Sequence, residues 1–233
     1  MPTKYDVVII GGGHNGLVAA GYLAKAGKSV LVLEKQSVVG GAAVSAQAFS
    51  GQDARLSRYS YLVSLLPEQI IHDLELDVRL APRRFGSYTP NRYGNNGLLI
   101  DKDDAEATRR SFEAVGAAED YESWQNFYAN TERVAKALFP TVLHPLRTER
   151  EIRQMLGEKL WLEFFVQPIG KTIETYFESD LVRGVVMTDA LIGTFAPNLD
   201  AALDANKCFL YHVIGNSTGD WNIPVGGMGA ITG

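Results

Sequence analysis

Residues 5–34 read YDVVIIGGGHNGLVAAGYLAKAGKSVLVLE, and they carry the strongest structural pattern in the chain. Two apolar runs rich in β-branched residues, YDVVII at 5–10 and SVLVL at 29–33, are typical of buried parallel strands. Between the runs, apolar side chains recur on one face of a predicted helix, at Leu17, Ala20, Leu23 and Ala24. Strand, helix and strand within about 30 residues form a βαβ unit, which predicts an α/β fold with a right-handed crossover.

A glycine motif joins the first predicted strand to the helix. Gly11 permits a tight turn, Gly13 lets a pyrophosphate approach the backbone, and Gly16 lets helix and strand pack closely. His14 and Asn15 open the helix, where free backbone N–H groups and the helix dipole favour a phosphate. The histidine ring itself is interpreted as solvated, so its backbone N–H matters more. The pattern predicts a dinucleotide site, and the alternative is a glycine turn without a ligand.

An acidic residue ends the second predicted strand. Glu34 lies 18 residues after Gly16, where a carboxylate can accept hydrogen bonds from both ribose hydroxyls and would repel a 2′-phosphate. The βαβ unit alone does not separate FAD from NAD. The pair Gly40-Gly41 follows closely and brings a second stretch of backbone towards the cofactor.

These motifs resemble a known family. GGGHNG at 11–16, the dipeptide Glu34-Lys35 and GGAAVS at 40–45 are similar to the FAD-binding start of the glutathione-reductase-type flavoproteins, and most similar to their phytoene dehydrogenase-like group. The resemblance continues through three longer segments, RYSYLVSLLPEQIIHDLEL, FESDLVRGVVMTDALIG and WNIPVGGMGAITG. It covers most of the chain, and it implies a Rossmann-like FAD/NAD(P)-binding lobe followed by a partial mixed strand and helical substrate lobe.

The resemblance also implies a cofactor and an activity. FAD would be bound by Gly11, Gly13, His14, Asn15, Gly16, Glu34, Lys35 and the backbone of Gly41 and Ala42. The full enzyme would move a hydride from a C–C or C–N bond of a small molecule, with lipophilic compounds among the candidates, to flavin N5. The chain departs from the pattern at Ala42, where carotenoid desaturases and amine oxidases usually place an arginine, so that arginine's role does not carry over. No catalytic residue is identified.

Composition excludes several classes of function. Of the 233 residues, 22 are basic and 27 acidic, for a net charge of -5, which argues against a nucleic-acid-binding surface. Cys208 is the single cysteine, so the chain can form neither a redox pair nor a cysteine zinc site, and disulfide reductase chemistry is excluded. No metal site is expected. No signal peptide or presequence and no run of 18 apolar residues is visible, which predicts a cytoplasmic protein; mitochondrial residence rests only on analogy.

The density and spacing of charged residues change near residue 100, which predicts a domain boundary there. Residues 1–100 would form the FAD-binding lobe and residues 101–233 a partial, mostly helical substrate lobe. Twenty-one of the 49 charged side chains lie in residues 101–160 at helical spacing, with breaks near Gly116 and Pro140. Asp101-x-x-Asp104 and Asp120 are the predicted helix N-caps.

The last motif, Pro224-x-Gly226-Gly227-Met228-Gly229, ends close to the end of the chain. In the family it resembles, this turn leads into a helix and the chain continues, so we expect an N-terminal fragment whose helix is too short to stabilise itself. Half of a flavin pocket should bind FAD weakly. The alternative is a natural short protein with a glycine-rich tail.

Several further residues are candidates with a structural alternative. A loop expected near the flavin holds Arg55, Arg58, Tyr59 and Ser60, and its arginines are first interpreted as surface residues. Asp189 lies in a nearly apolar helix, where a structural hydrogen bond is favoured over a role towards substrate. Core packing is favoured over a cavity lining for the aromatic group Tyr211, His212 and Trp221.

A second class of function uses the same scaffold without catalysis. Relatives that escort prenylated GTPases share this fold and work without flavin, and a regulatory role is a third option. Intact Gly16 and Glu34 argue for a cofactor, because a pure scaffold has no need of them. The substrate, the electron acceptor and the oligomeric state are not readable from the sequence.

Overall fold

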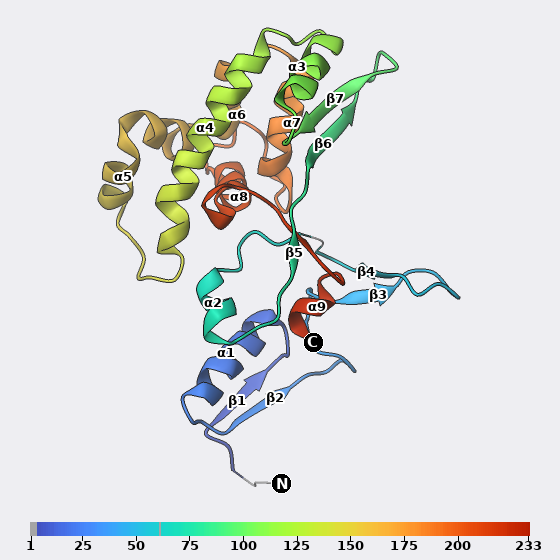
Figure 1. The fold of residues 1–233 in the computed structure, drawn as a ribbon. Helices are drawn as coiled ribbons and strands as arrows, with labels where there is room; N and C mark the ends of the chain where they lie inside the picture. The colour runs from blue at the N-terminus through green and yellow to red at the C-terminus, as the bar shows by residue number, and fades with distance from the viewer. Residues whose placement is uncertain (1–3, 61) are drawn as a thin grey trace. The chain divides into compact units, whose positions relative to one another are not determined.

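The computed structural model describes residues 4–60 and 62–233, and the chain forms two compact units (Figure 1). Residues 1–82 and 221–233 form the first unit, and residues 83–220 form the second. The division differs from the expected boundary near residue 100, and it returns the end of the chain to the first unit.

The predicted βαβ unit is confirmed as the start of the first unit. Strand β1 (Val7–Ile10) pairs in parallel with β2 (Val30–Leu33), and helix α1 (His14–Lys25) connects them. Lys25 occupies the last turn of the helix, and Gly27 follows at φ +77°, a conformation typical of a glycine that ends a helix. The structure thus shows the expected Rossmann-like α/β arrangement.

The burial expected for these two strands is wrong. Ile10 is 87% exposed, and neither strand contains a fully buried residue. Within the described part of the chain, β1 and β2 pair only with each other, so the apolar side chains of this sheet are only partly covered. Figure 1 shows the two strands side by side next to α1. The first unit therefore has a small buried core, formed by Ala43, Val63 and Met228.

Two antiparallel ladders complete the first unit. One pairs β3 (Ser45–Gln47) with β4 (Arg55–Ser57), and the other pairs β5 (Leu80–Ala81) with β8 (Ile223–Pro224). The short helices are α2 (Glu68–Asp73) and α9 (Gly229–Thr232). Because β8 pairs with β5, residues 221–233 belong to the first unit, whereas the sequence placed them in the substrate lobe.

Helix α9 is held by hydrogen bonds to other segments of the first unit. The Ser57 hydroxyl accepts from the Met228 N–H at 3.0 Å, and the Ser45 hydroxyl accepts from the Gly229 N–H at 2.9 Å. Thr232 donates from its hydroxyl to the Ala43 carbonyl at 2.7 Å. A four-residue helix forms too few internal hydrogen bonds to be stable alone. Hydrogen bonds to other segments at both of its ends supply the missing stabilisation.

The second unit is mainly helical. It begins with the antiparallel hairpin β6 (Phe85–Pro90) and β7 (Gly97–Asp101). The helices that follow are α3 (Ala105–Ala114), α4 (Asp120–Leu138), α5 (Glu149–Trp161), α6 (Ile169–Tyr176), α7 (Asp180–Leu191) and α8 (Asp204–Val213). Three short turns lie at Phe139–Thr141, Leu162–Val166 and Gly215–Ser217. Among the described residues, no helix is long and apolar enough to cross a membrane.

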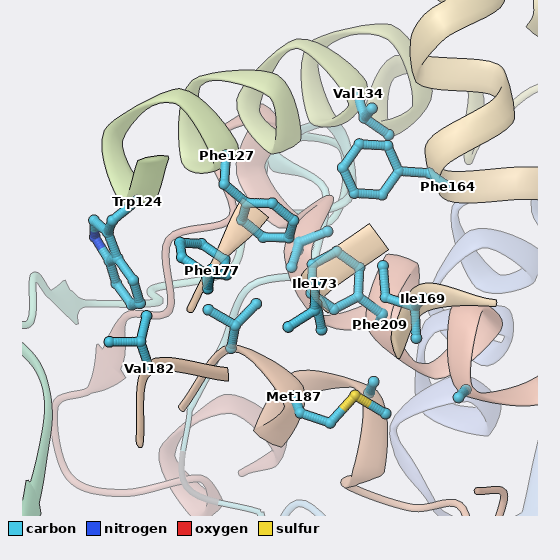
Figure 2. Packing of buried hydrophobic residues seen from close by; sticks show 14 of the residues in the cluster. Trp124, Phe127, Val134, Phe164, Ile169, Ile173, Phe177, Val182, Met187 and Phe209 are labelled. Carbon is cyan, nitrogen blue, oxygen red and sulfur yellow. The ribbon is translucent and has the colours of Figure 1, made fainter. Parts of the chain in front are cut away.

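Aromatic rings fill the core of the second unit (Figure 2). Phe127 of α4 lies at its centre, with ring centroids of Phe164, Phe177 and Phe209 at 6.0, 5.5 and 5.9 Å. Leu98 of the hairpin is fully buried in the same core. Because Leu98 packs in this core, the hairpin belongs to the second unit and the boundary lies before β6. The sequence placed the boundary later because the charge-rich segment begins only after the hairpin.

The predicted N-caps have different outcomes. Asp101 is the last residue of β7 and caps no helix, whereas Asp104 caps α3 and accepts from the Ala107 N–H at 2.8 Å. Asp120 is already the first residue of α4, and its buried carboxylate accepts from the backbone N–H groups of Glu178 and Ser179, both at 2.8 Å. It therefore ties α4 to the start of α7 instead of capping its own helix.

A π-helical turn, Leu162–Val166, follows α5 and is held by a buried asparagine. Asn206 of α8 donates to the carbonyls of Phe164 (3.0 Å) and Gln167 (2.9 Å) and accepts from the Ile169 N–H at 2.9 Å. These backbone groups lie where the regular α-helical ladder is interrupted. One side chain thus satisfies three of them.

Replacing Asn206 by alanine should lower the free energy of unfolding by about 3 kcal/mol or more, because three backbone groups lose their partner in a buried site. Urea denaturation measures the effect. Asn198→Ala, at an exposed asparagine in the same unit, is the control and should change stability little. Equal stability of the two variants would contradict this role for Asn206.

Candidate dinucleotide site

The glycine-rich loop starts where β1 ends. Gly11 has φ +97°, a backbone conformation that favours glycine, and its N–H donates to the Leu33 carbonyl at 2.8 Å. The chain turns here out of the sheet and enters α1 at Gly13, the N-cap residue. The loop is therefore anchored to the end of β2.

Gly16 is required by packing within the protein. A Cβ atom at this position would lie 2.4 Å from the Gly11 carbonyl oxygen and 3.3 Å from Ile9 Cγ2. The close approach of helix to strand that the motif predicted is therefore present. Any larger residue would push α1 away from β1.

Gly13 has a different character. Its φ of −71° suits any residue, and a Cβ there would meet no described atom closer than the Gly41 Cα at 3.9 Å. Neither strain nor crowding in the described chain calls for glycine at this position. A bare backbone at a helix start is what a close-lying phosphate group needs.

The second glycine pair lies directly against this loop. Gly40 forms a parallel bridge with Gly13, and its N–H donates to the Gly12 carbonyl at 2.7 Å. A Cβ on Gly41 would lie 3.0 Å from the Gly13 Cα. Gly13 and the pair Gly40-Gly41, which are far apart in the sequence, thus form one surface made almost entirely of backbone. Ala42 follows, and its carbonyl accepts from the Ser60 hydroxyl at 3.2 Å.

Glu34 faces the loop from the end of β2. Its carboxylate accepts from the Gly12 N–H at 2.7 Å and from the Gln36 N–H at 2.8 Å. These backbone hydrogen bonds, that of Gln36 first and that of Gly12 second, lower the pKa of the carboxyl below its ordinary value of 4.5. Each carboxylate oxygen has a second lone pair, so the ionised group can still accept from further donors.

The start of α1 offers donors. No side chain of the described residues caps Gly13, and the first turn contains no acidic residue. His14 and Asn15 are exposed there. Positive helix-dipole charge at this end is therefore uncompensated. Lys35 is exposed beside Glu34 and adds a cation near the same end of the sheet.

The sequence analysis missed some residues that shape the candidate site. Gly12, left out of the predicted set, supplies the N–H that orients Glu34. Ser45 and Ser57 hold residues 226–229 against the segment after Gly41. The glycine triplet could have indicated Gly12, whereas single serines about 180 positions away from their partners carry no sequence signal.

The remaining candidates are divided between the two units. Arg55, Arg58 and Tyr59 are exposed, and the Arg58 guanidinium stacks over the Tyr59 ring at 5.3 Å. Trp221 belongs to the first unit, whereas Tyr211 and His212 belong to the second. Asp189 is half-buried in α7. Within residues 4–60 and 62–233, no cluster of three or more His, Cys, Asp or Glu side chains could hold a metal ion.

Residues 9–68 match the family model of the NAD(P)-binding Rossmann-like domain. An uncharacterised protein of Mycobacterium tuberculosis is 48% identical over 98% of this chain and 44% of its own length. The pyridine nucleotide-disulfide oxidoreductase domain-containing protein 2 of Rattus norvegicus is 32% identical over 100% of the chain and 45% of its own length. The chain therefore spans less than half the length of these curated relatives.

A solved structure shares the fold. Putrescine oxidase bound to putrescine matches with a TM-score of 0.56 and 22% identity, over 98% of this chain and 47% of that protein. At this identity the match concerns the fold alone.

Proposed function

Because the chain is homologous to the N-terminal part of the FAD/NAD(P)-binding oxidoreductases, we propose that its first unit binds the ADP half of FAD. The pyrophosphate would lie against the Gly11–Gly16 loop and the start of α1. Glu34 would accept hydrogen bonds from the ribose, and the Gly41-Ala42 backbone would border the cofactor on the other side.

Gly13 is the observation that carries this proposal. The protein's own packing accounts for Gly16, whereas nothing described around Gly13 needs a missing side chain. The donors at the helix start, the ionised Glu34 and the bare Gly13–Gly41 surface together match an adenine dinucleotide. The family matched by residues 9–68 binds NAD(P), so the choice of FAD over NAD(P) is the more specific part of the proposal.

The activity we propose belongs to proteins of the relatives' full length. FAD supplies the hydride-accepting chemistry when it is bound. This chain would bind and orient the ADP half, while the second unit would form part of a substrate lobe for a small molecule. The exposed apolar side chains of β1 and β2, Val8, Ile10 and Leu33, would be covered in such a protein.

Titration of the chain with ADP and with FAD, followed by calorimetry or flavin fluorescence, tests the proposal. We expect saturable binding of both, with ADP contributing most of the affinity because its contacts are those this chain provides. Absence of saturable binding for both nucleotides would contradict it and favour a flavin-free scaffold.

A further inference from the structure

Gly12 lies inside the glycine-rich loop but has none of the roles of the three motif glycines. Its backbone φ lies outside the positive region, so conformational strain does not call for glycine here. The residue is buried, and both of its backbone groups are engaged. Its N–H donates to the Glu34 carboxylate at 2.7 Å, and its carbonyl accepts from the Gly40 N–H at 2.7 Å. Gly12 therefore has no free donor to offer a phosphate.

Crowding explains why this position has no side chain. A Cβ atom on Gly12 would lie 3.0 Å from Val39 Cγ1, 3.3 Å from Glu34 Oε2 and 3.4 Å from Glu34 Cβ. The first two separations are shorter than ordinary van der Waals contacts, so a neighbour would have to move by a few tenths of an ångström. The empty space beside Gly12 is thus the space that the present position of the Glu34 carboxylate needs.

Two backbone N–H groups hold the Glu34 carboxylate, one on each oxygen. Gly12 donates to Oε2 at 2.7 Å, and Gln36 donates to Oε1 at 2.8 Å. Both distances are typical of hydrogen bonds to a charged group. Contacts on two different atoms fix the rotation of the planar group, whereas a single contact would let it turn. Glu34 is half-buried, and each carboxylate oxygen keeps a lone pair for a further donor.

We propose that Gly12 is a positioning residue that determines how the dinucleotide site recognises ribose hydroxyls. Its N–H and that of Gln36 hold the Glu34 carboxylate in one orientation, in which its two oxygens accept from the two neighbouring hydroxyls of a ribose. The missing side chain leaves room for that orientation. The ligand class selected in this way is a ribonucleotide, as opposed to a deoxynucleotide. This inference rests on the proposed function, because it concerns the same adenine nucleotide site.

Competition between ADP and 2′-deoxy-ADP for the chain tests this role. The natural chain should prefer ADP by about tenfold, because the 2′-hydroxyl donates to a charged acceptor. In Gly12→Ala the ratio should fall to about threefold or less, because the methyl group displaces the carboxylate. A merely structural defect in the loop would weaken the binding of both nucleotides equally and leave the ratio unchanged. An unchanged ratio in Gly12→Ala would therefore overturn the proposal.

Val39→Ala is the matched control for that variant. It changes the side chain nearest to the Gly12 position but leaves both N–H donors of Glu34 in place. The preference for ADP should therefore stay at about tenfold. Loss of the preference in Val39→Ala would show that apolar packing, and not the pair of N–H groups, holds the carboxylate, and it would overturn the proposal.

The pKa of Glu34 gives a second readout that needs no nucleotide. The hydrogen bonds from Gln36 and Gly12 lower this pKa below its ordinary value of 4.5, so weakening the bond from Gly12 should raise it towards that value. NMR titration of the side-chain carboxyl groups measures the change in Gly12→Ala. A Glu34 pKa that does not rise would overturn the positioning role. Absence of nucleotide binding to the natural chain would contradict the proposed function instead, and the titration would still decide whether Gly12 holds Glu34.

Discussion

Replacing Gly13 by alanine is expected to weaken dinucleotide binding by about 100-fold or more while leaving the fold intact. The new methyl group would occupy the space over the helix start and separate the phosphates from several charge-assisted hydrogen bonds. The protein itself has room for it, since the nearest described atom is 3.9 Å away. Calorimetric titration with ADP and FAD, together with a thermal melt, measures both effects.

Gly16→Ala is the matched control for that variant. The same methyl group would lie 2.4 Å from the Gly11 carbonyl oxygen, so it should lower the free energy of unfolding by about 1–3 kcal/mol. We expect Gly16→Ala to lose both nucleotide binding and stability, and Gly13→Ala to lose binding alone. This difference would show that the ligand requires glycine at position 13, whereas packing requires it at position 16. Unchanged nucleotide affinity in Gly13→Ala would sink the phosphate assignment.

Replacing Glu34 by arginine should abolish FAD retention and reverse the preference between two nucleotides. The natural carboxylate favours ADP over 2′,5′-ADP, because it accepts from ribose hydroxyls and repels a 2′-phosphate. The guanidinium loses those acceptors and attracts the phosphate instead. Competition between the two nucleotides in a binding assay gives the ratio. A ratio that stays in favour of ADP would refute the ribose role of Glu34.

Glu34→Gln and a pH series refine this test. The amide keeps one acceptor oxygen near Gly12 but loses the charge, so we expect an intermediate loss of about tenfold. Because the pKa of Glu34 is lowered, the stability contributed by its ionised form is present above pH 4.5 and is lost only as the pH falls through the lowered folded-state value. The contribution of Glu34 to ADP binding should thus persist from neutral pH down to 4.5, so the difference in affinity between the natural chain and Glu34→Gln should stay constant over this range.

The incomplete cover of the small sheet has a consequence for any use of this chain. Ile10 is the most exposed large apolar residue in the described strands, and folded proteins usually cover such side chains. The second unit, by contrast, has a dense aromatic core around Phe127. The first unit is therefore expected to unfold more easily than the second. A ligand that binds the folded first unit would raise its free energy of unfolding.

Local patterns account for what the sequence predicted well. The βαβ unit, the Asp104 cap and the contact at Gly16 all depend on residues within a few helical turns of each other, and spacing alone encodes them. Asp120 shows the limit. It has the residue type of an N-cap, but its partners are the backbone N–H groups of Glu178 and Ser179, just before α7 and almost 60 residues later.

The sequence by itself therefore determined the Rossmann-like start, its glycine surface and the acid beside it, because periodicity and short spacings specify them. The tertiary structure alone decided that residues 221–233 return to the first unit and that the boundary precedes β6. Each of these depends on which distant side chains and backbone groups meet after packing, and no local spacing records that.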